Sequence, residues 1–114
     1  MAIGAKVLGI AQDGGHPHPG CKEICCQEAW ADTDRGHLVA CLGVTTDEGV
    51  WLVDATPDLP RQLHTLTEGH SLPFQGILLT HAHWGHVGGL GWLGEEALAA
   101  EGLSCLAPRG VVEA

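Results

Sequence analysis

Residues 76–80, Gly-Ile-Leu-Leu-Thr, form an uncharged and mostly aliphatic run that restricts the fold more than any other segment. Such a run is typical of a strand buried on both faces of an α/β sheet. The segment before it has a different period: Leu59, Leu63 and Leu66 recur on one face of a helix that ends at Gly69. A helix followed by a buried strand indicates a layered α/β fold.

The other segments extend this sheet within a single domain, since 114 residues suffice for one domain and not for two. Asp47-Glu48-Gly49 is typical of a hairpin turn between two strands. Cys41 and Cys105 fall inside expected strands and are expected in the core. We expect strands at 5–10, 37–46, 50–54, 76–80 and 103–107, and helices at 23–30, 56–69 and 90–102.

Acidic residues dominate the charged surface: fourteen Asp and Glu against five Lys and Arg give a net charge of −9. Nucleic acids and anionic membranes both require a basic surface, so neither is an expected partner. The chain has no apolar run of the roughly 18 residues that a membrane helix needs, and its first 15 residues lack the plan of a signal peptide. We therefore expect a cytoplasmic protein.

Three histidines follow the 76–80 strand in the segment Thr-His-Ala-His-Trp-Gly-His. In extended backbone, side chains two positions apart point the same way, so His81 and His83 can share one metal ion. His86 lies where the chain turns into the next helix and can swing back to the same pocket. Imidazoles at this spacing suit zinc, iron or manganese. The alternative is that the histidines only line a loop, but the third histidine and the neighbouring glycines favour a metal site.

This segment resembles the H-x-H-x-D-H motif of the metallo-β-lactamase fold superfamily, with matches at His81, His83 and His86. Three longer stretches resemble the pyrroloquinoline quinone biosynthesis protein B family: VLGIAQDGGHPHPGC, LVDATPDLPRQL and GILLTHAHWGHVGGLGWLG. The resemblance implies an αββα sandwich of which this chain is the N-terminal half, so we expect 1–114 to be a truncated portion. It also implies that Asp54, at a strand end, supports the metal-binding loop through hydrogen bonds.

Gly85 stands where the superfamily has an aspartate that ligates a second metal. Glycine offers no oxygen, so the resemblance favours a mononuclear site on His81 and His83, with His86 nearby. Restoring aspartate at position 85 is expected to return the missing ligand. Asp13, followed by two glycines, resembles the first loop of the family, which borders the site, and is equally typical of a plain turn.

Cys21, Cys25 and Cys26 lie in a loop rich in glycine and proline, beside His16 and His18. Thiolates bind zinc tightly, and a loop without regular structure gains order from such a site. Members of the resembled family hold a structural zinc in a cysteine-rich knuckle at this place, so we expect a structural zinc here. The alternative is a group of reduced, partly buried thiols.

The expected function is that of a metal-dependent hydrolase with a metal-activated water, because a bound metal lowers the pKa of water from about 15.7 toward 7. Zinc is the expected metal, with iron or manganese as alternatives. The resemblance implies a link to pyrroloquinoline quinone biosynthesis and a small-molecule or peptide substrate, and it leaves a homodimer open. The alternatives are an iron-dependent oxygenase and a non-catalytic remnant that binds zinc or a partner.

Overall fold

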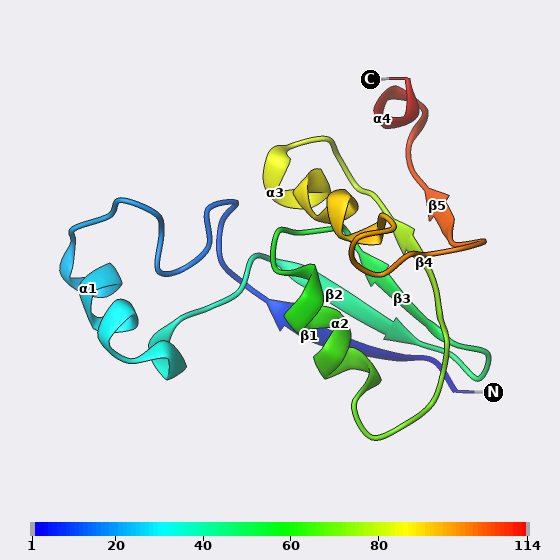
Figure 1. Cartoon of the computed structure of the whole chain (residues 1–114), viewed down its shortest axis with the longest axis horizontal. Helices are drawn as coiled ribbons and strands as arrows, with labels where there is room; N and C mark the ends of the chain where they lie inside the picture. The colour runs from blue at the N-terminus through cyan, green and yellow to red at the C-terminus, as the bar shows by residue number, and fades with distance from the viewer. Residues whose placement is uncertain (1, 114) are drawn as a thin grey trace.

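The computed structural model describes residues 2–113, which form a mixed five-stranded sheet with helices packed against it (Figure 1). The strands lie in the order β1-β2-β3-β4-β5. None of the helices in the described part of the chain has the length and apolar character of a membrane span. The elements are β1 (Gly4–Gly9), α1 (Ile24–Ala31), η1 (Thr33–Arg35), β2 (Cys41–Thr45), β3 (Val50–Val53), α2 (Leu59–Thr67), β4 (Phe74–Leu78), α3 (Trp84–Val87), η2 (Gly88–Leu93), β5 (Ser104–Leu106) and α4 (Arg109–Val112).

Strand β2 runs opposite to the other four strands of the sheet. The pairs β1–β2 and β2–β3 are antiparallel, whereas β3–β4 and β4–β5 are parallel. The predicted hairpin turn between β2 and β3 is confirmed, and the hydroxyl of Thr46 accepts the backbone N–H groups of Glu48 and Gly49 at 3.1 and 3.2 Å. The carboxyl ends of β3, β4 and β5 therefore lie at the end of the sheet opposite this hairpin.

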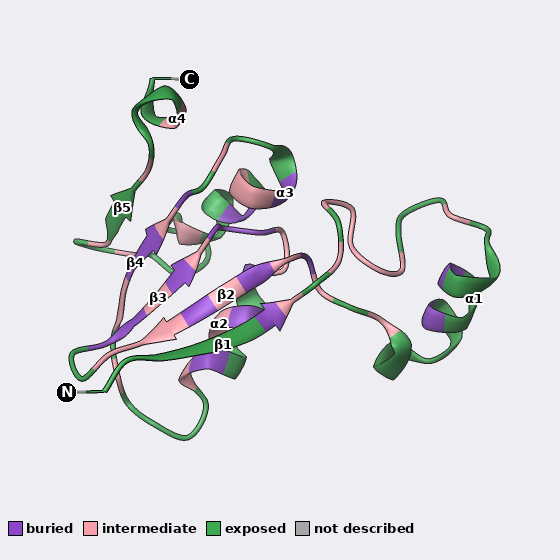
Figure 2. Ribbon diagram, turned by 180° about the vertical axis from the view of Figure 1, so that it is seen from behind, coloured by how far each residue is buried: buried purple, intermediate pink, exposed green. Residues whose placement is uncertain are grey.

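The core lies between the sheet and α2. Leu52 and Ile77 are fully buried and pack with Leu59 and Leu66 of α2. Figure 2 shows the sheet from the side away from α2: buried and half-buried residues alternate along β2 and β3, whereas most of β1 is exposed. Leu78 of β4 is half-buried, so the expectation of a strand covered equally on both faces is not met within residues 2–113. The fully covered face is the one that α2 contacts.

The helix expected over 90–102 is wrong. The structure has the short 3₁₀ helix η2 over Gly88–Leu93, followed by turns in which Ala97 and Ala99 donate to the carbonyl of Gly94. Glycine costs about 1 kcal/mol in a helix interior relative to alanine, and four of the seven residues from 88 to 94 are glycine. The leucine spacing alone therefore could not sustain an α-helix here.

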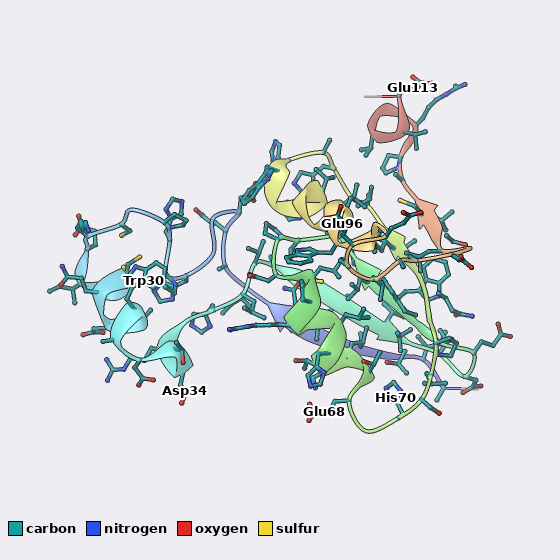
Figure 3. The ribbon with its side chains drawn as sticks, viewed as in Figure 1. Trp30, Asp34, Glu68, His70, Glu96 and Glu113 are labelled. Atoms are coloured by element: carbon teal, nitrogen blue, oxygen red, sulfur yellow. The ribbon has the colours of Figure 1, made fainter. Side chains whose placement is uncertain are left out.

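Residues 11–40 form an excursion that leaves the sheet between β1 and β2 and carries α1 and η1 (Figure 1). Trp30 and Asp34 belong to this excursion and lie well apart from His70 and Glu96, which lie on the sheet side of the molecule (Figure 3). Isolated bridges between Ala11 and Val39 and between His16 and His37 join the two ends of this excursion, which we call its neck.

A buried glutamine joins this neck to α2. The side-chain amide of Gln62 donates to the carbonyl of Val39 at 2.7 Å, and its side-chain oxygen accepts the hydroxyl of Thr56. The N–H of Val39 donates to the carboxylate of Asp58 at 2.9 Å. Both backbone groups of Val39 are therefore satisfied by side chains at the start of α2.

Replacing Gln62 with leucine is expected to lower the free energy of unfolding by about 1–3 kcal/mol, because the Val39 carbonyl and the Thr56 hydroxyl would lose their buried partner. Denaturant unfolding followed by circular dichroism measures the change. The matched control is Gln27→Leu in the exposed part of α1, where we expect an effect within about 0.5 kcal/mol. Equal effects of the two substitutions would contradict the assigned role of Gln62.

Candidate metal centre

The candidate site forms where β3 and β4 end side by side. Val53 pairs with Leu78 in parallel register, and the N–H of Asp54 donates to the carbonyl of Leu78 at 2.7 Å. Asp54 then takes a left-handed backbone conformation with φ 71°, which turns the chain away from the sheet at this residue. The segment that follows β4, with Thr80 and His81, therefore lies directly beside Asp54.

The carboxylate of Asp54 is buried, and hydrogen bonds surround it. The N–H of Thr80 donates to it at 2.8 Å, and the hydroxyl of Thr80 lies 2.8 and 3.0 Å from its two oxygens. The Nδ1 of His86 lies 2.8 Å from the same carboxylate. A carboxylate can only accept, so the Nδ1 of His86 carries the proton, and in the neutral imidazole its Nε2 then has a lone pair for a metal. Asp54 therefore orients His86 through hydrogen bonding.

Thr80 extends this arrangement to His81. The hydroxyl of Thr80 lies 2.8 Å from the Nδ1 of His81. A hydroxyl has a single proton, and when that proton is donated to the Asp54 carboxylate, its oxygen accepts from the Nδ1–H of His81. Both imidazoles then carry their protons on Nδ1 and present Nε2, the arrangement that carboxylate-supported metal ligands have in proteins.

The structure brings His81, His86 and Asp54 together as one potential metal-binding group, with one donor atom of each within 4.8 Å of the others. The ring centroids of His81 and His86 lie 4.1 Å apart. His83 packs edge-on against His81, with a distance of 4.7 Å between the ring centroids. His83 is exposed and is not a member of that group. Two imidazoles and a carboxylate fit the ligand preferences of zinc, iron and manganese.

Asp13 lies against this group, although its sequence context was equally typical of a plain turn. One of its oxygens lies 3.5 Å from the Nε2 of His86, and the other accepts the N–H of Gly85 at 3.1 Å. Asp13 follows β1 and is 72 residues from Gly85 in sequence. The Asp-Gly-Gly sequence was the one signal available, and it is shared by ordinary turns.

A second potential metal-binding group forms in the excursion. It comprises His16, Cys25 and Cys26, with donor atoms within 4.8 Å of one another. Cys21 lies next to it, where a hydrogen bond with Cys26 raises the pKa of the Cys21 thiol. In the described part of the chain, the buried Nδ1 of His16 has no hydrogen-bond partner. The structure thus gathers the three predicted cysteines and adds a histidine that the sequence had placed only nearby.

The model of the metallo-beta-lactamase superfamily matches residues 35–103, which include the site formed by Asp54, His81 and His86. The chain belongs to this superfamily. The mixed sheet with potential metal-binding residues at the carboxyl ends of β3 and β4 is therefore part of a metallo-beta-lactamase fold, as the sequence predicted.

Within the superfamily, the chain resembles coenzyme PQQ synthesis protein B. It is 34% identical over 92 residues to that protein of Rhodopseudomonas palustris strain BisB5, with 74% of this chain and 30% of the relative covered. The corresponding protein of Methylobacterium nodulans is 37% identical over 95 residues, with 75% and 32% covered. The chain spans about a third of the length of these curated relatives.

Solved structures agree with this placement. The crystal structure of Zn(2+)-bound PqqB from Methylobacterium extorquens superposes with a TM-score of 0.79 at 30% identity, covering 96% of this chain and 38% of that one. A diphosphatase from the PhnP family superposes with a TM-score of 0.65 at 27% identity, covering 81% and 34%. The predicted resemblance to the protein B family is confirmed.

Cys41 lies beneath the metal-binding group, with its Sγ 3.8 Å from the carbonyl of Asp54. Burial, with a smaller contribution from the charge of Asp54, raises the pKa of the Cys41 thiol from 9.0 to about 12. Cys105 was also expected in the core, and this expectation is wrong: β5 is an edge strand and its residues are exposed.

We expect Cys41 to resist thiol reagents at pH 8, because only the thiolate reacts and its fraction is about a thousandfold lower at the raised pKa. Exposed Cys25 and Cys105 should react rapidly in the metal-free native chain. Mass spectrometry of the labelled peptides assigns each rate, and labelling in denaturant, where all five thiols should react, is the control. Native labelling of Cys41 at the rate of Cys105 would contradict its buried, protonated state.

Proposed function

We propose that this chain supplies the metal-binding part of a metal-dependent hydrolase, with His81, His83 and His86 as ligands. The observation that carries the proposal is the hydrogen-bonded unit of Asp54, Thr80, His81 and His86, which leaves the Nε2 atoms of two neighbouring imidazoles free. We assign His83 as the third ligand because its exposed ring already contacts that of His81.

In this proposal each of the four residues in the hydrogen-bonded unit has a defined role. His81 and His86 hold the ion through Nε2, and Thr80 and Asp54 keep both rings oriented and their Nδ1 atoms protonated. A bound zinc ion would supply the chemistry by lowering the pKa of water enough for attack on an ester, amide or phosphoryl centre near pH 7. Zinc is the proposed metal because a PqqB neighbour is described as zinc-bound.

The relatives suggest where the substrate is to be sought. Their names assign them to coenzyme PQQ synthesis, so we propose a role for this chain in the same synthesis, acting on a small molecule or a peptide. A structural neighbour is a diphosphatase, which makes phosphoryl esters the second class to test. A panel of phosphodiester, carboxylic ester and amide substrates separates these reaction classes.

Replacing His81 and His83 together with alanine should remove metal from this centre. The protein is loaded with Zn²⁺, dialysed and analysed for metal content, and the double variant is expected to retain about one equivalent less than the wild type, because ligand loss costs much more than the tenfold affinity typical of a lost supporting bond. His64→Ala together with His70→Ala, two exposed histidines outside the site, is the matched control. Equal metal content in all three proteins would overturn the assignment.

We also propose that Cys21, Cys25, Cys26 and His16 hold a structural zinc. Three thiolates and one imidazole make up a four-ligand set that is common for structural zinc. The buried Nδ1 of His16 has no hydrogen-bond partner among the described residues, and this supports a metal ion bound to it. Helix α1 has only two buried residues, so a metal would add to the small amount of packing that holds the excursion together.

Chelation should accordingly lower the melting temperature by about 5 °C or more, since 1 kcal/mol corresponds to about 4–8 °C in a domain of this size. A double variant, Cys25→Ser with Cys26→Ser, should show a lower melting temperature from the start and a smaller further decrease on chelation than the wild type, because only the ion at the histidines remains to be removed. Cys105→Ser on the exposed edge strand is the control for loss of a thiol. Unchanged metal content and melting temperature in the double variant would show that these cysteines are ordinary thiols.

A further inference from the structure

Gly85 is a buried glycine whose backbone does not require glycine. It lies in α3 and is not among the residues with positive φ, so an L-amino acid could adopt its conformation. A Cβ atom at this position would lie 2.5 Å from the Cα and the Cγ of Asp13 and 2.6 Å from its Cβ. Glycine is therefore required for space, and Asp13 is the residue that takes the space.

The carboxylate of Asp13 is held there by a specific contact. One of its oxygens accepts the N–H of Gly85 at 3.1 Å, which fixes the side chain against the start of α3. The other oxygen lies 3.5 Å from the Nε2 of His86. Asp54 occupies the opposite side of that ring through Nδ1, so Nε2 is the atom through which His86 can bind a metal.

The spacing of these two atoms matches a pair of ligands on one ion. Two ligands that are each about 2.0–2.1 Å from a tetrahedral zinc lie about 3.3 Å apart. The separation of 3.5 Å between the Asp13 oxygen and the His86 nitrogen is close to this value. The side chain of Asp13 is 44% exposed, so an ion can reach it from solvent without unfolding the site.

We propose that Asp13 is a metal ligand of this centre, and that Gly85 is glycine so that the carboxylate can arrive from the loop after β1. The inference rests on the proposed function, since it requires a metal at His86. Positions 13 and 85 are then coupled: one carboxylate is needed between them, and there is room for only one. Gly85→Asp alone, which the sequence suggested would restore a ligand, instead places two side chains in the same volume.

The substitution Asp13→Asn separates metal binding from positioning. Asparagine has nearly the same shape and can still accept the N–H of Gly85, but it lacks the charge and the second carboxylate oxygen. Calorimetric titration of the metal-free chain with Zn²⁺, and with Co²⁺ as a spectroscopic probe, is expected to show affinity at this centre at least about tenfold weaker than in wild type. The melting temperature of the metal-free variant is expected to stay within a few degrees of wild type.

Substitution of Gly85 gives a second test. Gly85→Asp alone should lower both the melting temperature and the metal affinity, because the new Cβ meets the Cα of Asp13 as well as its side chain. Since the Cα remains in place, Asp13→Gly combined with Gly85→Asp should not recover the affinity lost in Asp13→Gly. The matched control for charge is Asp47→Asn in the exposed β2–β3 turn, at the end of the sheet opposite the site. It should bind metal as the wild type does.

The outcomes distinguish this inference from the proposed function. If the His81→Ala, His83→Ala double variant binds one equivalent of metal less than the wild type, and Asp13→Asn binds as tightly as wild type, the inference falls and the proposed function stands. If wild type and the double histidine variant bind metal equally, both fall. Weak binding by Asp13→Asn, with a metal-free melting temperature close to that of wild type, supports both.

Discussion

The carboxylate of Asp54 lies in the interior at the end of β3, and a buried charge is stable only when hydrogen bonds replace its water. Those bonds come from the N–H and hydroxyl of Thr80, after β4, and from His86 in α3. Satisfying one buried group thereby joins three separate segments. The same bonds orient His86 and, through Thr80, His81, so the stability of this end of the sheet and the geometry of the candidate metal centre depend on the same interaction.

The candidate site also depends on two close backbone approaches, each of which is possible only at a glycine. A Cβ at Gly89 would lie 2.0 Å from the carbonyl of Thr56, so the chain after α3 can pack against the segment after β3 only without a side chain there. Gly85 likewise leaves room for the carboxylate of Asp13. The glycine-rich composition near the histidines thus reflects packing around the site, and Gly89 is also one of the four glycines within 88–94 that disfavour an α-helix there.

The two potential metal-binding groups differ in what surrounds them. Asp54, His81 and His86 are held by a sheet with a packed core, so this group needs no ion to keep its shape. His16, Cys25 and Cys26 lie in an excursion whose neck is closed by two isolated bridges and by Gln62. A metal there would contribute mainly order, whereas a metal at the sheet edge would contribute chemistry.

The sequence by itself determined the α/β class, the β2–β3 hairpin, helix α2 and the histidine-bearing segment after β4, because each depends on local patterns of apolar residues, turns and spacing. It also pointed to Asp54 through family resemblance. Only the tertiary structure decided that His86 pairs with Asp54, that His16 joins the cysteines, and that Asp13 occupies the space beside Gly85. These contacts join residues that lie 9 to 72 positions apart, and such distances are set by how strands align and helices pack, which no local pattern encodes.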